Sequence, residues 1–135
     1  MSIAWDDSLA VGDPALDSDH RHMVELIAAL ESAALAPFDP GRVSGLLTDL
    51  LDHCRAHFVR EETVMHRVGF PGLEDHRLRH DLLRRRLEGL VAHYGDSPDE
   101  VRAEILRTLG DSLATWMIGH VTRCDRDYRP FLPRA

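Results

Sequence analysis

The sequence predicts an all-α protein, an antiparallel up-down-up-down four-helix bundle with an ordered N-terminal arm. Three observations predict this fold class. Four long stretches repeat apolar residues every three or four positions, the period of a helix with one buried face. Proline and glycine mark the boundaries between these stretches, and no stretch has a persuasive strand pattern. The connections are short, so consecutive helices should run antiparallel. We expect residues 1–135 to form a single domain.

The first helix is expected to follow an arm formed by residues 1–16, which contain glycine, proline and scattered apolar residues. Asp17 or Ser18 should begin the helix, because both residue types are good N-caps. Pro37 and Pro40 should end it, since proline cannot continue a helix. The apolar positions that keep the helical period are Met23, Val24, Ile27, Leu30 and Ala34.

The second and third helices are expected on either side of a turn that contains glycine and proline. The second should run from near Gly41 to about Val68. The third should run from about Leu73 to Tyr94 and stop at Gly95. Both carry an apolar stripe for one face of a bundle.

The fourth helix is expected to start after Ser97 and Pro98. Ser97 suits the N-cap, and proline fits the first helical position because its missing N–H is not needed there. Pro130 and Pro133 close the chain.

Charge and hydropathy argue against two classes of partner. The formal net charge is −7, from 16 basic and 23 acidic residues. The densest basic stretch, residues 84–86, is flanked by Asp81 and Glu88, so we interpret it as a solvated helix face. We therefore expect no nucleic-acid partner. We expect no membrane partner either, because no segment approaches the ~20 apolar residues that a membrane span needs.

The cysteines and the first residues of the chain bear on its location. The N-terminus lacks the basic start and apolar run of a signal peptide, so we expect a cytoplasmic protein. Cys54 and Cys124 are too few and too far apart for a disulfide framework, and we expect both to be thiols. A monomer is expected.

The nine histidines carry most of the functional information. Residues four apart lie about 40° from one another around a helix axis, and so share a face. His57 and Glu61 have this spacing on the second helix, and His76 and His80 have it on the third. The first and fourth helices each contribute further candidates. The complete set of candidate metal ligands is His20, His57, Glu61, His76, His80, His120 and Asp125.

This set predicts a metal centre inside the bundle. Imidazole and carboxylate suit iron, zinc, manganese and copper better than magnesium or calcium. Five histidines and two carboxylates are more than one ion can use, whereas two ions with bridging carboxylates would use all seven. Any one pair could instead lie on a helix surface, but all four helices place such groups beside apolar residues. Burying them without a cation would be costly.

Helical spacing does not by itself select Asp125. It lies about 140° around the helix from His120. Cys124 and Asp127 lie closer to the His120 face. His53, one turn before His57, is expected at the rim of the site, and His22 is expected in solvent.

Four segments together resemble the hemerythrins, and among them the single-domain bacterial form, bacteriohemerythrin. The resemblance covers almost the whole chain, and the segments agree in order and spacing. They are residues 17–20 (DSDH), 53–62 (HCRAHFVREE), 76–80 (HRLRH) and 116–125 (WMIGHVTRCD).

The resemblance implies two non-haem iron ions, joined by an oxo or hydroxo bridge and by two carboxylates. By position, one iron would take the histidines at 76, 80 and 120, and the other those at 20 and 57. Glu61 and Asp125 would bridge the two. The iron with two histidines would keep an open position at which dioxygen binds and leaves. The expected walls of a dry pocket there are Met23, Ile27, Leu113, Trp116 and Met117.

The sequence departs from family habit at two positions. Asp19 stands where glutamine is common, and Phe70 stands where tyrosine is common. We expect neither side chain to touch a ligand.

Reversible dioxygen binding for storage, delivery or sensing is the leading functional prediction, so we expect a binding protein more than an enzyme. The alternative is a di-iron redox enzyme on the same scaffold, either peroxidase-like or nitric-oxide-handling. The ligand set cannot separate these two. A ferritin-like oxidase is disfavoured because the sequence contains no Glu-x-x-His pair. A zinc hydrolase is disfavoured because it contains no His-Glu-x-x-His.

Overall fold

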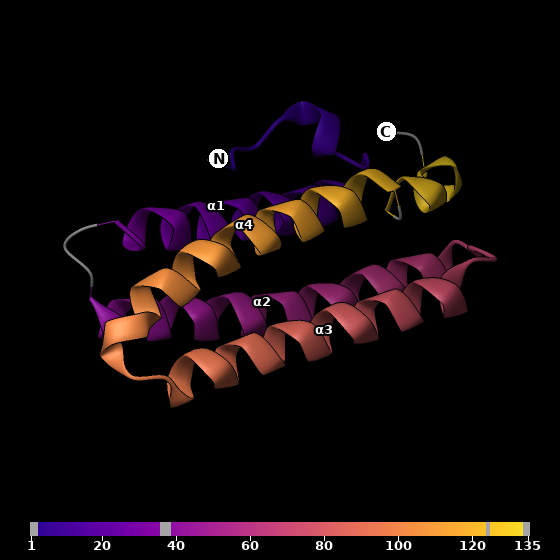
Figure 1. The fold of residues 1–135 in the computed structure, drawn as a ribbon. Coiled ribbons are helices and arrows are strands. Elements are labelled where there is room, and N and C mark those ends of the chain that lie inside the picture. The colour runs from indigo at the N-terminus through magenta and orange to yellow at the C-terminus, as the bar shows by residue number, and fades with distance from the viewer. Residues whose placement is uncertain (1–2, 36–38, 124, 134–135) are drawn as a thin grey trace.

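Four long helices form an antiparallel bundle in the computed structural model of the chain (Figure 1). The structure describes residues 3–35, 39–123 and 125–133; for residues 109, 110, 122, 123, 125 and 126 it describes the backbone alone. The helices are α1 (Pro14–Ala33), α2 (Pro40–Arg67), α3 (Leu73–Asp96) and α4 (Asp99–Arg123). Two short 3₁₀ helices flank them, η1 (Asp7–Leu9) and η2 (Asp125–Phe131). The predicted fold class is confirmed.

Helix α1 begins earlier than the sequence predicts. Asp13, not Asp17 or Ser18, is the N-cap, and its carboxylate accepts hydrogen bonds from the backbone N–H groups of Ala15 and Leu16, both at 3.0 Å. Pro14 occupies the first turn, where its fixed φ suits a helix start. The arm therefore ends at residue 13 instead of residue 16.

The carboxylate of Asp17 holds the arm instead of capping a helix. It accepts hydrogen bonds from the backbone N–H groups of Val11 at 2.7 Å and Gly12 at 3.1 Å. Gly12 has a φ of +102°, a conformation that favours glycine. The backbone N–H of Ile3 donates to Glu31 at 2.8 Å, so the arm is fixed to α1 at both ends.

The ends of α3 and α4 also differ from the predictions. Helix α3 continues two residues past Tyr94. Ser97 closes α3 and does not cap α4: its hydroxyl donates to the carbonyl of His93 at 2.7 Å. Pro98 stands just before α4, which starts at Asp99.

The α2–α3 turn needs two glycines for different reasons. Gly69 has a φ of +71°, in the left-handed region. At Gly72 a Cβ atom would lie 2.7 Å from the ring of Phe70, which is too close for any other residue without movement.

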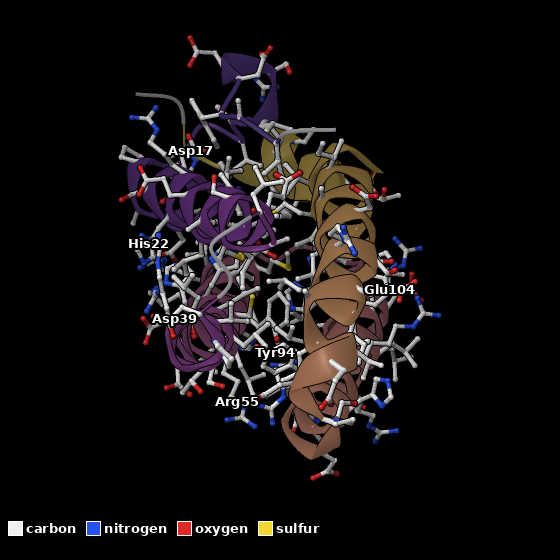
Figure 2. All side chains as sticks on the ribbon, turned by 60° about the vertical axis from the view of Figure 1, so that its left-hand side comes forward. Asp17, His22, Asp39, Arg55, Tyr94 and Glu104 are labelled. Carbon is white, nitrogen blue, oxygen red and sulfur yellow. The ribbon has the colours of Figure 1, made fainter. Side chains whose placement is uncertain are left out.

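Apolar residues fill the bundle in two clusters, and polar residues lie between them. The larger cluster occupies most of the interior and includes Leu30, Leu47, Leu50 and Leu106. The smaller one, at the end where α2 turns into α3, consists of Val11, Leu16, Met65, Leu73, Tyr128 and Leu132. In the oblique view of Figure 2, Tyr94 lies between the helices, whereas His22 and Glu104 lie outside. Among the described residues, no helix is long and apolar enough to cross a membrane.

Candidate metal centre

Glu61 is the centre of the polar layer. Its side chain is fully buried, and each of its oxygens faces a different pair of histidines. Oε1 lies 2.9 Å from Nε2 of His76 and 2.9 Å from Nε2 of His80, both on α3. Oε2 lies 3.2 Å from Nε2 of His57 on α2 and 3.4 Å from Nε2 of His20 on α1. One carboxylate therefore connects groups from three helices.

Two overlapping groups of side chains offer converging ligand atoms. One consists of Glu61, His76, His80 and His120, and the other of His20, His57 and Glu61. Within each group the ligand atoms lie within 4.8 Å of one another. His120 on α4 joins the first group through its Nε2, which lies 3.1 Å from Nε2 of His80. Six of the seven predicted ligands thus come together.

The structure describes the backbone of Asp125 but not its side chain. Its backbone starts η2, two positions after the last residue of α4. Cys124 also lies outside the described residues. Asp125 as a second bridging ligand stays a prediction.

Helical spacing explains why the groups converge. The four-residue intervals between His57 and Glu61 and between His76 and His80 put each pair on the inner face of its helix. Each of these four side chains is at most 3% exposed, as is His20. Neighbouring positions along each helix belong to the apolar clusters, so packing of those clusters fixes the height of the polar layer.

Two acidic side chains outside these groups support the histidines. The Oδ2 atom of Asp19 lies 2.9 Å from Nδ1 of His57, and Oε2 of Glu62 lies 2.9 Å from Nδ1 of His80. The expectation that Asp19 touches no ligand candidate is therefore wrong. Asp19 precedes His20 by one residue, a rotation of about 100° that turns it toward α2 while His20 faces inward.

Tyr128 is the third supporting residue, and sequence reasoning missed it. Its hydroxyl donates a hydrogen bond to Oε2 of Glu61 at 2.8 Å, and both side chains are fully buried. No periodicity pointed to it, because η2 lies beyond the last long helix.

Electrostatics hold Glu61 in its charged form. Burial raises its pKa, but the close contacts with His20, His57, His76 and His80 outweigh burial and hold the pKa well below 4.5. At His57 burial lowers the pKa, but the contacts with Asp19 and Glu61 outweigh it and raise the pKa above 6.5. The two carboxylates beside His57 therefore favour the charged form of its imidazole.

The donor set fits a metal. Asp19 and Glu62 accept from Nδ1 of their histidines, which turns the two Nε2 atoms toward Glu61. Each Nε2 then meets an acceptor oxygen at 2.9–3.2 Å, so the space between them must hold a proton or a cation. Imidazole nitrogens and a carboxylate in a buried position are ligands that iron and other transition metals prefer.

A small cavity of about 60 Å³ lies beside the histidines. The five predicted wall residues, Met23, Ile27, Leu113, Trp116 and Met117, all line it. His20, His57 and His120 line it as well, so the cavity connects both groups of ligand candidates.

Two further residues of the cavity wall were not expected there. Cys54 donates from its Sγ to Sδ of Met23 at 3.5 Å, and burial raises the pKa of its thiol to about 12. Phe58 stacks on the ring of His80, with centroids 4.0 Å apart.

The profile of the family described as "Hemerythrin HHE cation binding domain" matches residues 11–132. The chain belongs to the hemerythrin family. A bacteriohemerythrin of Pseudomonas paraeruginosa is 28% identical over 130 residues, which cover 93% of this chain and 78% of the relative. A bacteriohemerythrin of Ralstonia nicotianae is 30% identical over 132 residues, covering 92% of this chain and 84% of the relative.

The hemerythrin fold is also found by structural comparison. A crystal structure of wild-type hemerythrin superimposes with a TM-score of 0.80 at 24% identity, and 98% of each chain is covered. At this identity the likeness shows the fold alone. The family named from the sequence is confirmed by the profile match.

Two other histidines, His53 and His22, lie at the edge of the site. His53 lies with Nε2 2.9 Å from the backbone carbonyl of Asp19, and it belongs to neither group of ligand candidates. His22 packs edge-on against His53, and its side chain is 52% exposed. His53 therefore touches the residue that supports His57, without facing Glu61.

Proposed function

We propose that this hemerythrin binds dioxygen reversibly at a non-haem di-iron centre, for oxygen storage, delivery or sensing. One observation carries the proposal. The two oxygens of the buried Glu61 face two separate sets of histidine nitrogens, at 2.9 Å on one side and at 3.2–3.4 Å on the other. A carboxylate in that position suits a bridge between two cations. The chain's hemerythrin relatives include bacteriohemerythrins.

We assign the ligands of the two irons from the two groups. His76, His80 and His120 would bind one iron, and His20 and His57 would bind the other. Glu61 would bridge the irons, and Asp125 would be the second bridge. The unequal number of histidines supports an open coordination position at the second iron, because that group contributes fewer ligands.

When bound, the iron pair would supply two electrons and an open coordination position, which is the chemistry that reversible oxygen binding needs. The chain supplies the surroundings. The apolar walls of the cavity, among them Ile27 and Leu113, exclude water, which would promote loss of reduced oxygen species. Tyr128 donates to Glu61 and so keeps this carboxylate in one orientation.

The test is metal analysis combined with visible spectra of the reduced protein. After anaerobic loading with ferrous iron we expect two irons per chain. On addition of oxygen an absorption band should appear, and it should vanish when oxygen is removed. Immediate oxidation to the ferric form without a persistent adduct would contradict reversible binding and favour a redox enzyme. Fewer than two irons per chain would contradict the di-iron assignment.

A matched pair of variants tests the ligand assignment. His57→Ala should reduce iron from two to one per chain, because it removes one of the two histidines of the second iron. His53→Ala is the control, since His53 lies one turn earlier on α2 and belongs to neither group. Two irons retained in His57→Ala, or equal loss in both variants, would overturn the assignment.

A further inference from the structure

In each of the two groups of ligand candidates, Nδ1 of one histidine contacts an acidic side chain other than Glu61 on a neighbouring helix. Asp19 on α1 reaches His57 on α2, and Glu62 on α2 reaches His80 on α3, each with 2.9 Å between oxygen and Nδ1. Both carboxylates are largely shielded from solvent, with 13% and 23% of their side chains exposed. The contacts are therefore repeated, one for each proposed iron.

An arginine fixes each of these carboxylates. Nε and Nη2 of Arg60 donate to the two oxygens of Asp19, both at 2.8 Å, in a bidentate pair. Nε of Arg77 donates to Oε1 of Glu62 at 3.2 Å, which leaves Oε2 to His80. A bidentate guanidinium–carboxylate pair restricts the orientation of the carboxylate as well as its position. Asp19 is thus held more firmly than Glu62.

A carboxylate at Nδ1 affects what the opposite nitrogen does. It keeps the Nδ1 proton in place and Nε2 facing Glu61, so that Nε2 would offer its lone pair to a cation bound between the two. It also makes the imidazole a stronger electron donor to a metal, because the negative charge stabilises positive charge on the ring. A stronger donor stabilises the more oxidised metal ion, and this lowers the reduction potential of the metal.

We infer that Asp19, fixed by Arg60, is a positioning residue that orients His57 and lowers the reduction potential of the iron bound by His57. Glu62, fixed by Arg77, has the same role for His80 at the other iron. The inference rests on the proposed di-iron function. It adds that the reduction potential of each iron is set by a separate carboxylate, which itself binds no metal.

Asp19→Asn is the principal variant, because asparagine keeps an acceptor oxygen and nearly the same size but removes the charge. Asp52→Asn is the matched control. It removes the same charge from α2, where Asp52 is 67% exposed and pairs with Arg55 at 3.8 Å, away from both groups. Glu62→Gln tests the second carboxylate.

The first readout is a spectroelectrochemical titration of the iron-loaded proteins. Asp19→Asn and Glu62→Gln should each raise the reduction potential of one iron, so the separation between the two one-electron steps should change. The second readout is retention of iron against a chelator, which should fall by roughly 10–100-fold for the affected iron. Asp52→Asn should match the wild type in both. If Asp19→Asn has the same reduction potentials and the same iron retention as Asp52→Asn, the inference is overturned, even if the thermal stability of Asp19→Asn is lower.

A measurement on the wild-type chain remains decisive if a variant fails to fold. Histidine NMR of the zinc-loaded protein should show slowly exchanging Nδ1–H protons on His57 and His80. Unprotonated Nδ1 atoms there would refute the assigned contacts. If the wild type loads two irons and oxygenates reversibly while Asp19→Asn behaves like Asp52→Asn, this inference alone fails. If the wild type never loads a second iron, the proposed function fails instead.

Discussion

Replacing Tyr128 with phenylalanine should lower the free energy of unfolding by about 1.5–3 kcal/mol, the usual range for a hydrogen bond to a charged group. The hydroxyl donates to Oε2 of Glu61 at 2.8 Å, and neither side chain reaches solvent. Water cannot replace the lost donor, so the carboxylate loses this stabilisation in full. In a chain of this length the loss corresponds to a fall in the melting temperature of roughly 5–10 °C.

Tyr94→Phe is the matched comparison, because Tyr94 is also a buried tyrosine in the bundle, as Figure 2 shows. Its hydroxyl has no hydrogen-bond partner within the described part of the chain. Removing an unsatisfied hydroxyl from an apolar environment relieves a desolvation cost. The Tyr94→Phe chain should therefore be as stable as the wild type or more stable by up to about 1 kcal/mol.

Urea unfolding of the metal-free proteins, followed by circular dichroism, measures both free energies. The metal-free state is the stricter test, because bound iron would itself stabilise the native chain. A Tyr128→Phe variant no less stable than Tyr94→Phe would refute the reasoning that Tyr128 anchors Glu61.

Three other predictions follow from the cavity and the polar layer. Burial raises the pKa of the Cys54 thiol to about 12, so alkylation of Cys54 at pH 8 should be about a thousandfold slower in the folded than in the unfolded chain. The alkylation rate should rise only as the pH approaches that pKa, and fast labelling at pH 8 in peptide mapping would contradict this. Phe58 lines both the cavity and a groove between α2 and α3, so Phe58→Ala should admit water to the cavity and speed oxidation of the reduced iron. Val59 is exposed and lines the groove but not the cavity, so Val59→Ala should leave the oxidation rate unchanged. Equal oxidation rates for the two variants in stopped-flow spectra would argue against Phe58 as a barrier to water. Removal of metal should lower the melting temperature measured by calorimetry, since the inward nitrogens lose their partner, and an unchanged value would place the metal elsewhere.

The helices were predictable because their apolar period and their prolines are local signals. Their exact ends were not. Asp13 and Asp17 are equally good cap types, and the choice between them depends on the arm, whose N–H groups take the carboxylate of Asp17. Ser97 likewise suits either the C-terminal end of α3 or the N-cap of α4, and its hydroxyl bonds to a carbonyl of α3. Such choices depend on contacts that only the folded chain provides.

The convergence of His57, Glu61, His76 and His80 was predictable from their spacing, since a four-residue interval fixes a shared helix face. His20 and His120 have no such partner four residues away, and the resemblance to the hemerythrins supplied them. The supporting residues were not. Asp19 meets His57 across 38 positions of sequence, and Tyr128 meets Glu61 across 67. Both contacts depend on how neighbouring helices are rotated and on where η2 folds back, and helical periodicity contains no information about either.

Among the described ligand candidates, His120 is the last in chain order and the one that α4 contributes. Leu113 and Trp116, which close one side of the cavity, lie on the same helix. A nascent chain with its first three helices outside the ribosome would therefore hold an incomplete ligand set in a pocket still open to water. Uptake of metal by the full ligand set and closure of the bundle would then occur together, once α4 has packed, which would limit the time that reduced iron spends in an unprotected site.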